Sequence, residues 1–160
     1  MPSDTVKRTY NGKCLEFVLQ EGGRDWDLAE ANCVKRGGHL VTIQDIAEQN
    51  FILSTLRTLH FSGKGVWIGL TDYGHESRFT WSSGERLTFT HWEVGQPGSG
   101  HEYEDCVLLK YPTGYWSDEL CREFVFSGEY DEWICEYIAN SQRKLINWEY
   151  TPDQHNLENM

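Results

Sequence analysis

The segment from His91 to Asp118 reads HWEVGQPGSGHEYEDCVLLKYPTGYWSD and places three short motifs within 28 residues. They are a Gln-Pro-Gly turn at 96–98, a Glu-Asp-Cys triplet at 104–106 and a Trp-Ser-Asp triplet at 116–118. The oxygen-bearing side chains of this segment include Gln96, Glu102, Glu104, Asp105 and Asp118. Calcium takes about six to eight oxygen ligands, and a proline stiffens the turn that carries it. The segment therefore predicts a calcium-binding loop between two strands, with an acidic surface loop of no function as the alternative.

Length, composition and charge limit the classes of protein to which the chain can belong. With 160 residues, seven Trp and eight Tyr, we expect one domain with a real core. A formal net charge of -11 argues against nucleic acid or an anionic membrane as the partner. The sequence has no apolar run of about 18 residues, so we expect neither a transmembrane helix nor membrane insertion.

The chain has five cysteines, at positions 14, 33, 106, 121 and 135. None forms a Cys-x-x-Cys pair, which argues against a structural zinc site. We expect two disulfides and one unpaired cysteine in an oxidising compartment; the spacing leaves every pairing open, and five free thiols in the cytosol are the alternative. The first 13 residues lack the apolar stretch of a signal peptide. We therefore expect a secreted or extracellular protein, with its signal peptide absent from this sequence.

Hydrophobic spacing predicts two helices followed by several short strands. Asp25 can cap a helix that begins at Trp26 and ends at Gly37-Gly38, and Asp45 can cap a second helix that ends before Ser62. Aromatic and β-branched segments predict strands at 14–19, 66–70, 78–81, 106–111 and 132–137, with 39–43 extended. Helices followed by strands indicate an α+β fold, and the long loops between 71 and 100 are of a length usually found at functional sites.

Five motifs occur in a fixed order: Trp67-Ile-Gly-Leu, Trp92 with Gln96-Pro-Gly, Glu104-Asp-Cys, Trp116-Ser-Asp and Trp133-Ile-Cys-Glu. Together they resemble a C-type lectin-like domain, and the resemblance covers residues 12–138. We expect residues 1–11 to form a frayed N-terminal tail and residues 139–160 a polar C-terminal tail. The resemblance implies an α+β fold with two helices, two small antiparallel sheets and a long calcium-binding loop region.

The same resemblance implies how the cysteines pair. Cys33 would bond Cys135, and Cys106 would bond Cys121. The first bridge closes a long loop and would be worth about 4–5 kcal/mol by chain entropy. Cys14 stands where longer members carry the second cysteine of an extra pair. It would be free, bonded outside this sequence, or bonded between chains in a disulfide-linked dimer.

In sugar-binding members of that family, one calcium ion of the loop region also coordinates two vicinal hydroxyls of the sugar. Carried over to this chain, the resemblance assigns Gln96, Glu104 and Asp118 as ligands of that ion, with Ser117 beside them in the carbohydrate site. Gly98 and Ser117 stand where the family has amide or carboxylate side chains, which leaves fewer ligands for the ion.

Gln at position 96 resembles the galactose-type members, in which an aromatic ring stacks on the apolar face of the sugar. His101 and Tyr103, as well as Tyr115, are candidates for that ring. Packing of these rings within the loops is the alternative. The expected partners are therefore glycans, of galactose type rather than mannose type.

The resemblance also implies two further calcium sites. One comprises Asp72, Glu76, Glu104 and Asp105. The other comprises Glu48, Glu136 and a backbone carbonyl near Thr42. The alternatives are that Glu48 only caps its helix and that Glu136 is only a solvated strand end.

Two functions follow, and both are binding functions. The first is calcium-dependent carbohydrate binding by a lectin. The second is a calcium-independent surface of the same fold for a protein, a mineral or ice. Catalysis is not expected, because the chain has no Gly-x-Ser-x-Gly, no His-Glu-x-x-His and no phosphate-binding glycine loop.

Overall fold

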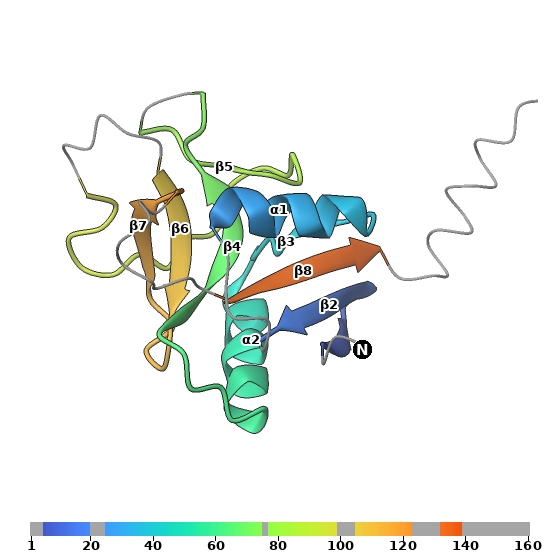
Figure 1. Ribbon diagram of the computed structural model, residues 1–160. Helices are drawn as coiled ribbons and strands as arrows, with labels where there is room; N and C mark the ends of the chain where they lie inside the picture. Colours follow the sequence, from blue (N-terminus) through green and yellow to red (C-terminus); the bar gives the residue numbers. More distant parts are fainter. Residues whose placement is uncertain (1–4, 20–24, 75–76, 99–104, 123–131, 139–160) are drawn as a thin grey trace, which may run out of the picture.

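The computed structural model describes residues 5–19, 25–74, 77–98, 105–122 and 132–138. The elements are, in order, β1 (Val6–Tyr10), β2 (Lys13–Val18), α1 (Trp26–Lys35), β3 (His39–Leu40), α2 (Ile46–Thr58), β4 (Gly65–Thr71), β5 (Thr80–Trp81), β6 (Asp105–Lys110), β7 (Trp116–Leu120) and β8 (Glu132–Ile138). The expected α+β class is confirmed (Figure 1). In the part of the chain that the structure describes, neither helix is long and apolar enough to cross a membrane.

The strands form one mixed sheet in the order β1-β2-β8-β4-β6-β7, with β3 paired to β8 and β5 paired to β4. The pairing of β4 with β8 is parallel, and Val66 and Trp67 lie opposite Glu132 and Trp133. The other pairings are antiparallel. The two small antiparallel sheets implied by the resemblance are thus joined into one sheet. A parallel pair needs a long connection, and here β5, β6 and β7 lie between β4 and β8 in the chain.

The central strands are buried on both faces, because one helix covers each face. The first core cluster gathers side chains of α2 with alternate strand residues, among them Ile52, Leu56, Phe17, Ile68 and Ile134. The second gathers side chains of α1 with the neighbouring strand residues, among them Trp26, Ala29, Val18, Trp67 and Trp133. Successive residues of a strand point to opposite faces, so strands covered on both sides read as continuous apolar runs.

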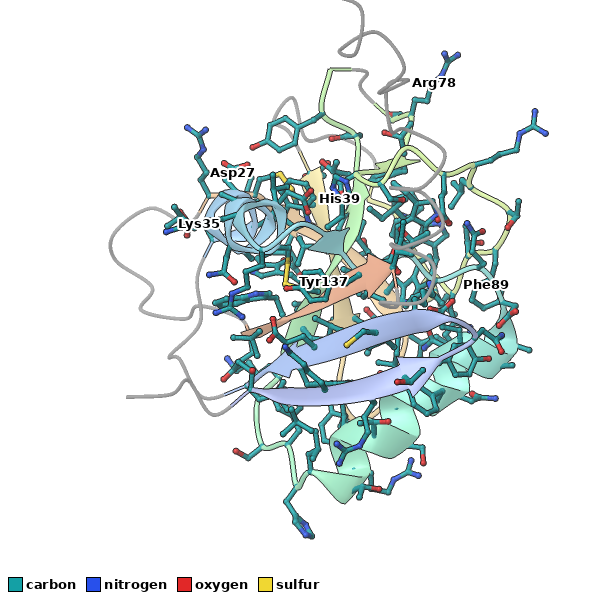
Figure 2. The ribbon with its side chains drawn as sticks, turned by 90° about the vertical axis from the view of Figure 1, so that its right-hand side faces the viewer. Asp27, Lys35, His39, Arg78, Phe89 and Tyr137 are labelled. Carbon is teal, nitrogen blue, oxygen red and sulfur yellow. A yellow bond between two sulfur atoms is a disulfide. The ribbon has the colours of Figure 1, made fainter. Side chains whose placement is uncertain are left out.

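The expectation of a frayed tail over residues 1–11 is wrong for residues 6–10, which form β1 and pair antiparallel with β2. The turn between them is Asn11-Gly12, and both residues have positive φ, 44° and 78°. Asn-Gly favours two-residue hairpin turns of this conformation, so the sequence contained the signal. The hairpin places Lys13 at the start of β2, and Figure 2 shows the two strands of the hairpin alongside α2.

Both disulfides implied by the resemblance are present. Cys33 of α1 is bonded to Cys135 of β8, and Cys106 of β6 is bonded to Cys121. The first ties a helix to the strand at the centre of the sheet, and the second ties β6 to the end of β7. Cys14 has a free thiol and is half-buried in β2.

The helix caps differ from each other. The side chain of Asp45 accepts a hydrogen bond from Glu48 N at 2.8 Å, as expected for a cap of α2. Asp25 occupies the capping position of α1, but its side chain makes no capping hydrogen bond. Gly37 ends α1 with a φ of 90°, a conformation that glycine adopts without strain.

Strand β7 is not among the strands predicted from the sequence, and it pairs antiparallel with β6. Its first residue, Trp116, is fully buried, and its Nε1 donates to Gln49 Oε1 of α2 at 3.0 Å. Gln49 Nε2 donates to the carbonyl of Gly114 at 2.6 Å. A buried amide of α2 therefore fixes both the turn before β7 and the indole that begins it.

We expect Gln49→Leu to lower the free energy of unfolding by about 2–4 kcal/mol, because each buried polar group left without a partner costs about 1–3 kcal/mol. Urea unfolding measures this change. The matched control is Asn50→Leu at the next, exposed position of α2, which should stay within about 0.5 kcal/mol of the unsubstituted protein. Equal effects of the two substitutions would contradict the role given to Gln49.

Candidate functional site

The Gln96 turn is fastened to the beginning of β7. Glu93 N donates to the carbonyl of Trp116 at 2.9 Å, and Gln96 N donates back to the carbonyl of Glu93 at 2.9 Å. The peptide bond between Gln96 and Pro97 is cis. The turn is thereby held beside the strand that carries Asp118.

Gln96 and Asp118, two of the predicted calcium ligands, lie in direct contact. Asp118 N donates to Gln96 Oε1 at 3.3 Å, and Gly98 N donates to Asp118 Oδ1 at 3.0 Å. The other carboxylate oxygen, Asp118 Oδ2, is buried and has no hydrogen-bond partner in the part of the chain that the structure describes. A buried carboxylate oxygen without a partner costs free energy, and a cation would satisfy it. The chemistry of this pair therefore fits a hard, oxygen-seeking ion.

Ser117 does not point its hydroxyl at this pair. It is buried, and its Oγ donates to Glu119 Oε1 at 3.0 Å. Side chains two apart on a strand share a face, so Ser117 and Glu119 lie together while Asp118 faces the other way. Glu119 is an exposed carboxylate on the face of β7 opposite to Asp118, and the sequence did not single it out.

Asp72 and Asp105, expected at the second calcium site, are also brought together. Both are buried. Asp72 Oδ1 accepts from Asp105 N at 2.8 Å, and Asp72 Oδ2 accepts from Ser77 N at 3.3 Å. The carboxylate of Asp72 therefore ties the loop after β4 to the start of β6.

The remaining residues predicted for these sites, Glu76, His101, Tyr103 and Glu104, lie outside the described residues. Among the described residues, no group of three or more His, Cys, Asp and Glu side chains is arranged to hold a metal ion. The complete ligand sets therefore stay predictions, of which the structure places two pairs, Gln96 with Asp118 and Asp72 with Asp105.

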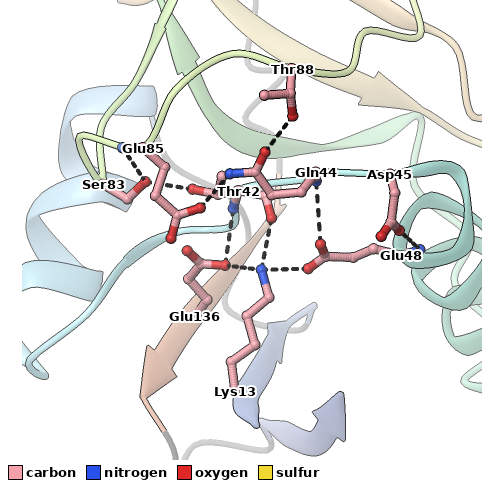
Figure 3. Close-up of polar contacts among 9 residues, drawn as sticks. All are labelled: Lys13, Thr42, Gln44, Asp45, Glu48, Ser83, Glu85, Thr88 and Glu136. Atoms are coloured by element: carbon pink, nitrogen blue, oxygen red, sulfur yellow. Dashed lines mark hydrogen bonds and ion pairs between the residues drawn. The ribbon is translucent and has the colours of Figure 1, made fainter. Parts of the chain in front are cut away.

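Glu48 and Glu136, expected at the third calcium site, converge on Lys13 (Figure 3). Lys13 Nζ lies 2.6 Å from Glu48 Oε1, 2.8 Å from Glu136 Oε2 and 2.9 Å from the carbonyl oxygen of Thr42. Glu136 is only 8% exposed, so it is not a solvated strand end. Sequence reasoning missed Lys13, and no local pattern could have found it, because 123 positions separate it from Glu136.

Burial and pairing act against each other in this cluster. Burial disfavours the charge of Lys13, but Glu136 and Glu48 outweigh it and raise the pKa of Lys13 above its usual value. Burial raises the pKa of Glu48, and Lys13 offsets this only in part. The ammonium is thus firmly charged and is the group that keeps the two carboxylates in a buried place.

Comparisons with known proteins agree on one family. The family model described as "Lectin C-type domain" matches residues 23–137. The mouse low affinity immunoglobulin epsilon Fc receptor is 33% identical over 133 residues, which are 83% of this chain and 36% of the receptor. The galactose-specific lectin nattectin of Thalassophryne nattereri is 33% identical over 115 residues, 71% of each chain. The chain thus spans little more than a third of the receptor's length.

Solved structures share the fold. The cow C-type carbohydrate-recognition domain of CD23, in the presence of a GlcNAc2Man3 oligosaccharide, is 29% identical with a TM-score of 0.68, covering 83% of this chain and 93% of that one. Human lithostathine is 28% identical with a TM-score of 0.70, covering 82% of this chain and 96% of that one.

The hydrogen bonds of Asp72 predict that it stabilises the fold in the absence of calcium. In excess chelator, Asp72→Ala should lower the free energy of unfolding by about 2–3 kcal/mol, because a buried hydrogen bond to a charged group contributes about 1.5–3 kcal/mol. Asp72→Asn keeps an oxygen for Asp105 N and should cost less. Chemical denaturation in chelator measures both. An Asp72→Ala protein as stable as the unsubstituted one would show that Asp72 serves the metal alone.

Proposed function

The chain belongs to the C-type lectin domain family, and from this membership we propose that it binds carbohydrate through a calcium ion held by Gln96 and Asp118. The observation that carries the proposal is the buried, unpartnered Asp118 Oδ2 beside the Gln96 amide. Family members are in general binding proteins rather than enzymes. Binding is therefore proposed here in preference to catalysis.

Charge balance completes the proposed site. Asp118 supplies one negative charge, and Glu104, at the position of a later family ligand, would supply the second. Two carboxylates balance one divalent ion, and the amide oxygen of Gln96 adds a neutral ligand. Ser117 is buried and bonded to Glu119, so the proposed site relies on Gln96, Glu104 and Asp118 for its side-chain ligands.

We propose a galactose-type glycan as the ligand class. Gln96 carries both an amide donor and an acceptor, in place of the acceptor-only carboxylate of Glu. Nattectin, which shares a third of its residues with this chain over the matched length, is named as galactose-specific. His101, Tyr103 and Tyr115 are the proposed stacking rings. Tyr115 is 45% exposed, and its ring stacks on His91 with centroids 4.9 Å apart.

A calcium-independent surface is the second candidate, and two observations favour it. Ser117 directs its hydroxyl to Glu119 rather than to Gln96 or Asp118. Gly98 offers only its backbone N–H, which donates to Asp118 Oδ1. Both reduce the number of oxygens that an ion would find.

The two disulfides support a place outside the cytosol. We propose that the domain is secreted or faces the extracellular side. The thiol of Cys14 is half-buried in β2, and a disulfide-linked dimer through it stays a prediction.

Retention on immobilised galactose, with immobilised mannose in parallel, tests the proposed function. With calcium the protein should be retained on galactose, and chelator should release it. Asp118→Asn keeps the shape of the side chain and the acceptor for Gly98 N but removes the charge. It should weaken binding at least tenfold, about 1.4 kcal/mol.

Glu93→Gln is the matched control, because Glu93 lies on the same loop but pairs with Lys110 at 2.7 Å. It should bind as the unsubstituted protein does. Retention that persists in chelator, or that Asp118→Asn leaves intact, would favour the calcium-independent function instead.

A further inference from the structure

The ammonium of Lys13 meets three oxygens, two of them through hydrogen bonds and the third, Glu48 Oε1, through an ion pair. An ammonium group has three N–H donors and no acceptor. Three oxygens meet it within 2.9 Å. They come from α2, from β8 and from the link between β3 and α2, as Figure 3 shows. The number of oxygens therefore matches the number of donors of a lysine.

The same carboxylates are also shared with backbone donors. Glu136 Oε2 accepts from Thr42 N at 3.1 Å, in addition to Lys13. Glu48 Oε2 accepts from Gln44 N at 3.3 Å. Calcium takes about six to eight oxygens, so an ion in place of the Lys13 ammonium would need water molecules to complete its coordination.

The charges of the cluster also favour the Lys13 ammonium over a calcium ion. Glu48 and Glu136 alone would balance a divalent ion. With the Lys13 ammonium between them, one negative charge remains, and an approaching calcium ion would meet a positive charge at the position it has to occupy. The two cations therefore compete for one place.

The cluster around Lys13 is open to solvent. A pocket of about 590 Å³ is lined by Lys13, Glu48 and Glu136. The Lys13 side chain keeps 21% of its surface exposed. Ions from solvent can thus reach the cluster, where the Lys13 ammonium occupies the position that a calcium ion would take.

We infer that Lys13 is the resident cation of the cluster formed by Lys13, Thr42, Glu48 and Glu136, and that it replaces a calcium ion there. The residue comes from the β1–β2 hairpin, which precedes residues 23–137 matched by the family model. The hairpin supplies a permanent, metal-free link between β2, β8 and α2. This link holds at any calcium concentration, in contrast to a site that empties when calcium falls.

The number of calcium ions bound per chain, measured by equilibrium dialysis, tests the inference. Lys13→Met removes the ammonium but keeps an apolar stem, and it should bind one more ion than the unsubstituted protein. Lys13→Met combined with Glu136→Gln should return to the original number. Failure of Lys13→Met to gain an ion would overturn the inference.

A second arm does not depend on whether Lys13→Met folds. Glu136→Gln alone should leave the number of bound ions unchanged, and the loss of one ion would show that the unsubstituted protein holds calcium in this cluster. Glu85→Gln is the control, because Glu85 lines the same pocket without contacting Lys13. Each comparison is a difference between variants, so the result holds whether or not calcium binds at Gln96 and Asp118.

Discussion

The burial of Trp116 is the constraint on which the loop region depends. Its ring is fully buried and packs edge-on against Trp81, Phe89 and Trp92, with centroids 5.7, 5.8 and 5.9 Å apart. Such arrangements favour aromatic pairs beyond the area they bury. Since Asp118 follows two residues later on the same strand, the position of the carboxylate is set by the core. The loops around the site can therefore vary without moving Asp118.

The molecule meets the problem of concentrated acidic charge in two ways. Between α2 and β8, buried carboxylates are neutralised in part by an ammonium of the same chain. Between the Gln96 turn and β7, one buried carboxylate oxygen has no hydrogen-bond partner among the described residues. The first arrangement carries its own cation, and the proposed function has the second take a cation from solution. A buried charge needs a partner. We therefore assign a structural role to the Lys13 cluster, whose partner is internal, and a binding role to Gln96 and Asp118.

The sequence predicted most of the fold, and the exceptions have physical reasons. Both helices follow the spacing of their apolar residues, and α2 has the cap expected from Asp45. Strand β7 was missed because Ser117 and Asp118 make its sequence too polar for a predicted strand. Its pairing with β6 and the burial of Trp116 stabilise it nevertheless. The contact of Lys13 with Glu136 depends on a pairing of distant strands that no local pattern reveals. The disulfide pairing came from family resemblance, since spacing alone left it open.

The most direct measurement of the central claim is a crystal structure of the protein with calcium and galactose. The account predicts an ion at about 2.3–2.6 Å from Asp118 Oδ2 and Gln96 Oε1, with sugar hydroxyls completing its coordination. A sugar bound in the absence of any ion at Asp118, or an ion bound only elsewhere, would contradict it.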